Sequence, residues 1–127
     1  MKSITKTMTN GEIYQIAIAL MNANLDDNET YMPAAVAFAI QKNKAALTGT
    51  AEDVEKGRMS IIEHYSTGQT EEGFTIPPEA VEKANNELKD LLEIEQEVKI
   101  YTFDIEALND VKLTSAQMQA IMFMIED

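Results

Sequence analysis

The side chains that could do chemistry in this chain are carboxylates and one histidine, His64. Nucleophilic catalysis by serine needs a histidine as its base. His64 falls beside Glu63 and Tyr65 near the predicted end of a helix, and we interpret it as a surface residue. Cysteine is absent, which removes thiolate nucleophiles, disulfides and thiolate zinc sites together. The 22 acidic residues guarantee that some carboxylates lie close together, so a pair of acids predicts no acid–base catalysis by itself.

Two short runs resemble ligand-binding loops but lack essential positions. The acidic run Asp26-Asp27-Asn28-Glu29-Thr30 invites comparison with a calcium loop. Tyr31 stands where that loop needs glycine, and Ala37 stands where it needs a bidentate glutamate. Thr48-Gly49-Thr50 is not followed by the lysine of a phosphate-binding loop. We therefore expect no catalytic, metal or cofactor site, and a protein that is not an enzyme.

One set of carboxylates does form a pattern. Five acids recur three, four or eight residues apart, on the face of a predicted helix opposite Val81, Leu88 and Leu92: Glu79, Glu82, Asp90, Glu93 and Glu97. Neighbours of this kind lie about 5–6 Å apart on a helix, which is close to the phosphate spacing of nucleic acid. Such a row could dock into a basic protein groove built for DNA or RNA. The alternative interpretation is an ordinary solvated helix face.

The elements that must position these residues are mostly helices. Thr9 and Glu12 have capping-box spacing, which predicts a helix from there to about Asn24. A second helix is predicted from Pro33 to Tyr65. Its apolar positions recur seven residues apart on both sides of Gly49, at Ile40, Leu47, Val54 and Ile61. A single glycine costs a helix only about 1 kcal/mol, so we predict that this helix is unbroken.

The remaining pattern predicts a return helix and a few short strands. The return helix runs from Pro78 to about Gln96, and we expect its core stripe to be Val81, Ala84, Leu88, Leu91, Leu92 and Glu95. Ser66 to Gly73 reads as a polar loop. The candidate strands are Ser3–Met8, Phe74–Ile76, Val98–Phe103 and Val111–Leu113. The predicted fold is mostly α (α+β): a long antiparallel helical hairpin with flanking helices and a small sheet of two or three short strands, in a single domain (1–127).

A final helix follows a second capping box, Thr114 to Gln117. From Met118 to Ile125 it is apolar nearly all the way round. Such a helix is either buried in its own core or shared with a partner, and we expect burial in the core.

The bulk charge restricts the partners. The formal net charge is −12, so repulsion from phosphate disfavours direct binding to nucleic acid or to anionic membranes. No segment has the roughly 18 apolar residues of a membrane span, and the first residues lack the apolar stretch of a signal peptide. We expect a cytoplasmic protein.

Several strings taken together resemble small uncharacterised proteins encoded by phages and prophages of Gram-positive bacteria. These strings are Asn10-Gly11-Glu12-Ile13-Tyr14, Gln41-Lys42-Asn43-Lys44, Glu55-Lys56-Gly57-Arg58-Met59, the run from Leu91 to Ile100, and Leu113-Thr114-Ser115-Ala116-Gln117-Met118. The resemblance implies a phage origin, and therefore action inside a bacterial cell or in a virion. Its motifs are structural and assign no functional residue.

These observations lead to two hypotheses of function. The first is a non-enzymatic protein-binding protein that inhibits a bacterial defence system, in the manner of an anti-CRISPR protein, through its acidic helical face. The second is a small virion or tail-assembly accessory held by apolar helix contacts. We also expect a homodimer. A helix of about 33 residues is roughly 50 Å long, whereas a compact body of this chain is about 36 Å across, so part of the helix needs another cover.

Overall fold

The computed structural model describes residues 2–25, 31–70 and 73–126. Four helices and four strands form in this part of the chain, and two short 3₁₀ turns accompany them. In chain order the elements are β1 (Lys2–Thr9), α1 (Asn10–Asn22), α2 (Ala34–Tyr65), β2 (Gly68–Thr70), β3 (Gly73–Thr75), α3 (Pro78–Glu93), β4 (Glu95–Thr102), η1 (Ile105–Leu108), α4 (Ser115–Ile121) and η2 (Met122–Met124). The mostly helical α+β prediction is confirmed.

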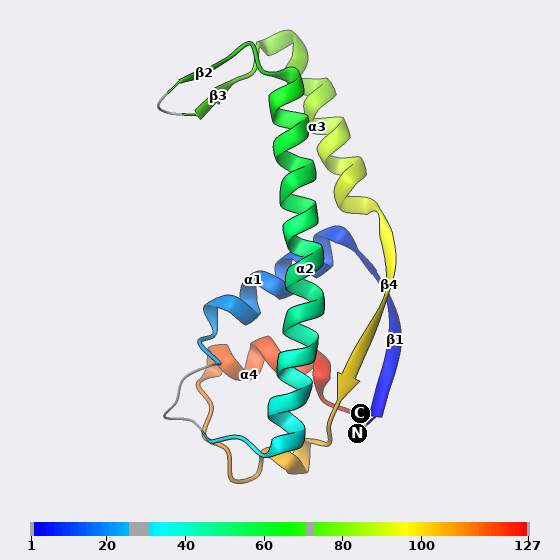
Figure 1. Cartoon of the computed structure of the whole chain (residues 1–127), viewed down its shortest axis with the longest axis vertical. Helices are drawn as coiled ribbons and strands as arrows, with labels where there is room; N and C mark the ends of the chain where they lie inside the picture. Colours follow the sequence, from blue (N-terminus) through cyan, green and yellow to red (C-terminus); the bar gives the residue numbers. More distant parts are fainter. Residues whose placement is uncertain (1, 26–30, 71–72, 127) are drawn as a thin grey trace.

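Helix α2 is the axis of the molecule, and all the other elements are arranged along it (Figure 1). It has 32 residues and runs through Gly49 without a break, as predicted; at 1.5 Å per residue this is about 48 Å. Its buried residues are confined to the N-terminal two-thirds: Val36, Ala39, Ile40, Asn43, Leu47, Ala51 and Val54. None of the α2 residues after Val54 is fully buried, because α3 is the main cover of this end among the described residues (Figure 1).

The core lies around the N-terminal part of α2. Its largest fully buried side chains include Ile13 and Leu20 from α1, Leu47 from α2, and Ile100 from β4. Ile121 and Met124 complete it from the C-terminal segment, whereas Met122 in the same segment is exposed, so the expected burial of that segment is confirmed only in part. The helix itself is shorter than expected, because α4 tightens into the 3₁₀ turn η2 after Ile121.

The main sheet joins the first strand of the described chain to the strand that follows α3. Strands β1 and β4 pair antiparallel over eight residues each, with Ile4 opposite Ile100 and Thr9 opposite Glu95. The free edge of β4 is closed at one point by the buried side chain of Asn43. The Tyr101 backbone N–H donates to Asn43 Oδ1 (2.8 Å), and Asn43 Nδ2 donates to the Tyr101 carbonyl (2.9 Å). This side chain fastens α2 to the sheet.

Three expectations about local structure were wrong or lie outside the described residues. Part of the polar loop Ser66–Gly73 is the strand β2, which pairs with β3. Val111–Leu113 is not a strand. The run compared with a calcium loop, 26–30, lies outside the described residues.

Helix α3 also differs from its prediction. It ends at Glu93 rather than near Gln96, and Glu95 already pairs with Thr9 in the sheet. Of its expected core stripe only Ala84 is buried. The pattern identified the apolar face correctly, but α2 covers only part of that face.

Because α2 is continuous, we predict that alanine substitutions at its two glycines change the free energy of unfolding differently. A Cβ at Gly49 would meet nothing within 4 Å, whereas a Cβ at Gly57 would lie 3.1 Å from Leu91 Cδ2. Gly49→Ala should raise the free energy of unfolding by about 0.5–1 kcal/mol in urea titrations, since alanine favours the helix. Gly57→Ala should gain less or lose stability, because Leu91 must shift. A loss of stability at Gly49 would contradict a continuous helix.

The contact of Asn43 with β4 predicts a large effect from one buried amide. Asn43→Ala leaves the Tyr101 backbone N–H and carbonyl without their partner and should lower the free energy of unfolding by about 2–3 kcal/mol. The control is Gln41→Ala, an exposed position on the same helix, where we expect a change within about 0.5 kcal/mol. Equal urea midpoints for the two variants would show that the Asn43 contact contributes little.

Candidate protein-binding site

The start of α1 fixes the end of α3. Asn10 is buried and its backbone N–H donates to the Ile94 carbonyl (2.8 Å), while its Nδ2 donates to the Leu91 carbonyl (2.9 Å). Gln96 Nε2 donates back to Asn10 Oδ1. The preceding residue, Thr9, caps α1 by accepting from the Glu12 N–H (3.1 Å). Asn10 therefore satisfies carbonyls that the end of α3 would leave without partners.

Two glycines allow the helices to approach one another here. Gly57 on α2 lies against Leu91, and a Cβ at Gly11 on α1 would lie 3.4 Å from the Leu92 carbonyl oxygen. A side chain at Gly57 would press on Leu91 of α3, whereas a Cβ at Gly11 would only reach ordinary van der Waals contact. The sequence thus holds α1, α2 and α3 close together at one junction.

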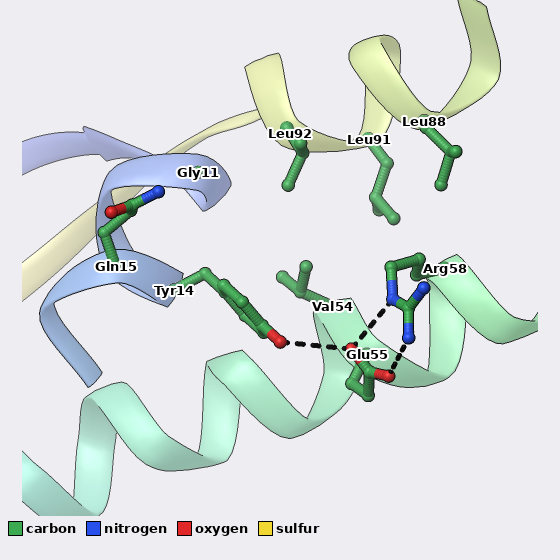
Figure 2. Close-up of a pocket in the computed structure, with 9 residues that line it drawn as sticks. All are labelled: Gly11, Tyr14, Gln15, Val54, Glu55, Arg58, Leu88, Leu91 and Leu92. Atoms are coloured by element: carbon green, nitrogen blue, oxygen red, sulfur yellow. Dashed lines mark hydrogen bonds and ion pairs between the residues drawn. The ribbon is translucent and has the colours of Figure 1, made fainter. Parts of the chain in front are cut away.

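A pocket of about 220 Å³ opens at this junction (Figure 2). Leu88, Leu91 and Leu92 of α3 line one side, and the buried Val54 of α2 lies opposite. The full lining is Gly11, Tyr14, Gln15, Val54, Glu55, Arg58, Leu88, Leu91 and Leu92. The pocket is therefore mainly aliphatic, with polar groups at one wall.

That polar wall is a hydrogen-bonded set of three side chains (Figure 2). The Tyr14 hydroxyl donates to Glu55 Oε2 (3.2 Å), and Arg58 donates to both Glu55 oxygens through Nε (3.0 Å) and Nη2 (2.5 Å). The hydrogen bonds from Arg58 hold the pKa of the Glu55 carboxyl below its ordinary value. The same pairing raises the pKa of Arg58. The charges of Glu55 and Arg58 already neutralise each other, so this wall presents polar groups to the pocket but no unpaired charge.

An apolar strip continues from the pocket along α3. Val81, Leu88 and Leu92 share one side of the helix through their spacing of seven and four residues. Val81 is 40% exposed and Leu92 is 41% exposed, while Leu88 is half-buried. Met59 and Ile62 of α2 are half-buried as well. We call the pocket and this strip the α2–α3 groove.

The carboxylates predicted as an interface are only partly brought together. Glu79, Glu82, Asp90 and Glu93 are exposed on α3, and their spacing sets them opposite the groove. Glu97 was wrongly placed on this helix, because it lies on β4. Lysines interrupt the row: Lys83 and Lys89 are interleaved with it, and Lys89 Nζ lies 3.9 Å from Glu93 Oε1.

The other sequence candidates form no site in the described residues. His64 is exposed and stacks edge-on against Tyr65, with ring centroids 4.8 Å apart. A hydrogen bond to Glu87 raises the pKa of the Tyr65 hydroxyl. Among residues 2–25, 31–70 and 73–126, no three His, Cys, Asp or Glu side chains cluster as metal ligands would. Nor does any helix in these ranges combine the length and apolar content of a membrane span.

The sequence pattern placed Val54, Leu88, Leu91 and Leu92 on apolar helix faces but did not identify the pocket or its polar wall. Glu55 and Arg58, three residues apart on a predicted helix, are a visible ion-pair signal. Nothing in the pattern brings Tyr14 to Glu55, because that contact joins two helices 41 residues apart.

The Glu55–Arg58 pair predicts a pH response that can be measured at one carboxyl. Arg58→Gln should raise the Glu55 pKa toward its ordinary value in an NMR titration, since the donors that stabilise the carboxylate are removed. The lowered pKa stabilises the wild-type fold above the unfolded-state pKa, and this contribution is lost as the pH falls through the folded-state pKa. Lys56→Gln removes a neighbouring cation and is the control. Equal Glu55 pKa values in the two variants would contradict the assigned cause.

Comparisons with known proteins give no match: no protein-family model, curated protein or solved structure is significantly similar to this chain. The case for a function therefore depends on the geometry of the α2–α3 groove and on the charges around it.

Proposed function

We propose that this chain is a non-enzymatic protein-binding protein whose contact surface is the α2–α3 hairpin. The observation that carries the proposal is the incomplete cover of α3. Its apolar face borders a pocket and stays half-exposed at Val81, Leu88 and Leu92, while carboxylates occupy the opposite face. Interfaces between proteins commonly have an apolar centre surrounded by a polar, solvent-accessible rim, and the half-exposed apolar side chains of α3 could form such a centre.

The hairpin is suited to this role because it projects from the core (Figure 1). The exposed carboxylates Glu79, Glu82, Asp90 and Glu93 lie on one rigid helix, so they can approach a basic surface together. Charges of this kind accelerate association and favour partners of opposite sign. A basic groove of a nucleic-acid-binding protein is the partner surface that fits this arrangement.

The sequence resemblance to phage and prophage proteins supports a specific setting. We propose that the protein acts in the bacterial cytoplasm, where it inhibits a defence protein that handles DNA or RNA. The rival function is a virion or tail-assembly accessory held by apolar contacts. It has less support, because Ile121 and Met124 of the apolar C-terminal segment are used in the protein's own core. Mass spectrometry of purified particles separates the two, since an anti-defence protein should be absent from them.

Charge reversal on α3 tests the proposed function. The variant Glu82→Lys, Asp90→Lys, Glu93→Lys should lose the host proteins that the tagged wild type captures from bacterial lysate at low ionic strength. Added salt should weaken wild-type capture steeply, because exposed charges are screened.

The matched control changes the net charge by the same amount elsewhere. Glu97→Lys, Glu106→Lys, Asp110→Lys alters exposed acids outside the hairpin and should capture the same proteins as the wild type. Unchanged capture by the α3 variant would remove the acidic row from the proposal. Equal loss in both variants would show that only the total charge matters.

A further inference from the structure

We infer that the outer edge of β4 is a second protein-binding site, which takes an extended acidic peptide segment as an added strand beside Lys42 and Lys99. The site lies between β4 and the N-terminal part of α2, so it goes beyond the function proposed for the α2–α3 hairpin. Three features carry it: open backbone groups on the strand, a hollow beside them, and two lysines that make no ion pair within the described residues.

The C-terminal end of this edge is closed by the protein itself. At Tyr101 the side chain of Asn43 meets both the backbone N–H and the carbonyl, at 2.8 and 2.9 Å. At the next outward position the Phe103 N–H donates to the Met124 carbonyl (3.0 Å), and the Phe103 carbonyl accepts from the Glu126 N–H (2.9 Å). A side-chain amide and a backbone segment thus already pair with this edge.

The N-terminal part of the edge stays open. In an antiparallel pair the backbone groups of alternate residues point to the same edge, and the β1–β4 register is regular over the whole of β4. Lys99 and Glu97 therefore direct their N–H and carbonyl groups to the same side as Tyr101. Within the described residues no hydrogen bond reaches these groups. An open strand edge of this kind is a template for an extended peptide.

A hollow of about 550 Å³ lies beside this open edge, between β4 and α2 (Figure 1). Its strand side consists of residues 96–99 and Tyr101, and its helix side consists of Lys42, Ala45, Ala46 and Thr50. Alanine and threonine are short, so α2 leaves room where an added strand would run, about 4.8 Å from β4. A segment of about three to five extended residues, at about 3.3 Å each, would span the open positions.

Two lysines gather at the Tyr101 end of the hollow. Lys99 Nζ lies 5.1 Å from the centroid of the Tyr101 ring, and Lys42 Nζ lies 5.6 Å from the centroid of the Phe38 ring. The two rings meet edge-on, with centroids 6.0 Å apart. The contacting rings therefore hold both cations at one place. A carboxylate on an added strand could approach both of them.

The other charges around the hollow fit an acidic occupant at this end. On the helix side, residues 30–51 contain lysine but no acid. On the strand side, Thr5 and Thr7 of β1 stand opposite Lys99 and Glu97 and carry no charge. Glu97 is the acid among the lining residues, and it lies beyond Lys99 on the side away from Tyr101. The partner's carboxylate therefore belongs beside the lysines, with an uncharged side chain near Glu97.

A second copy of this chain fits the edge less well. Its own edge strand β1 carries Lys2 and Lys6 and no acid, so it would bring cations toward Lys42 and Lys99. The net charge of −12 repels any acidic ligand at long range. That repulsion is screened beyond about 8 Å at physiological salt, so the nearby lysines determine the preference for an acidic segment.

A synthetic peptide tests the inference directly. The probe is a fluorescein-labelled peptide of about nine residues that alternates threonine and valine, with aspartate in place of the central threonines. Fluorescence anisotropy at physiological ionic strength should show saturable binding to the intact protein. Binding should also slow hydrogen exchange at the Glu97 and Lys99 amides, because an added strand pairs them. The Val98 and Ile100 amides already face β1 and should change little.

Charge and backbone variants separate the two parts of the site. Lys42→Glu, Lys99→Glu should weaken binding about tenfold or more, since cations that attract the carboxylate become anions. The matched control, Lys2→Glu, Lys6→Glu, makes the same change at exposed residues outside the hollow and should bind like the wild type. Two altered peptides should each bind at least about tenfold more weakly to the wild type: one with asparagine for aspartate, and one N-methylated at alternate residues.

Equal affinity of the wild type and Lys42→Glu, Lys99→Glu would overturn the inference, as would full binding of the N-methylated peptide. Equal binding of a single-stranded DNA of the same charge would also overturn it, because the lysines would then attract anions in general. Slower exchange of the Glu97 and Lys99 amides at raised protein concentration alone would make the second copy the occupant, and would overturn it as well.

The hairpin proposal fails separately, through unchanged lysate capture by the α3 charge variant. That variant should bind the peptide like the wild type, because its substitutions lie outside the hollow. The hairpin control includes Glu97→Lys, which keeps both lysines and the backbone groups of the edge, so it should bind the peptide at least as tightly.

Discussion

The structure depends on how one long helix buries its apolar side. Helix α2 needs cover along about 48 Å, and the elements that supply it are much shorter. Residues Val36 to Val54 pack against α1 and β4 and become the core. Beyond Val54 the main cover in the described part of the chain is α3, with Tyr14 of α1 reaching Glu55, and a single helix cannot enclose another helix. Exposed apolar surface on the hairpin is thus a consequence of the unequal lengths of α2 and its neighbours.

Two buried asparagines determine how that hairpin joins the core. Asn43 holds β4 to α2 through both backbone groups of Tyr101, and Asn10 holds the end of α3 through the Leu91 carbonyl. A buried amide without partners is costly, so each contact specifies a register rather than only adding attraction. Because Asn10 fixes α3, Leu91 and Leu92 come to lie over Gly57 and Gly11. The pocket is the space left between these fixed points.

Much of the helical framework could be predicted from the sequence, because a regular spacing of apolar residues that is kept over a long stretch indicates one continuous helix. The register of Ile40, Leu47 and Val54 correctly identified α2 as unbroken at Gly49. The end of α3 could not be found in the same way, since the run after Ile94 is rich in helix-forming residues and pairing with β1 makes it a strand. The exposure of Leu92 likewise could not be predicted, because it depends on how much of α3 the neighbouring helix α2 covers. Of the candidate interface, the sequence correctly placed four carboxylates on one helix but missed the pocket, whose residues meet only through tertiary contacts.

The features that make the hairpin available also leave it with fewer buried residues than the core. Its apolar contacts are few beyond Val54, and the carboxylates of α3 repel one another with only Lys83 and Lys89 interleaved. Regions with few buried contacts open at lower free energy than the core. A ligand that binds only the closed hairpin stabilises it in proportion to its affinity. Basic groups on that ligand would also reduce the repulsion along α3. The same uncovered leucines that weaken the isolated hairpin would therefore strengthen its complex.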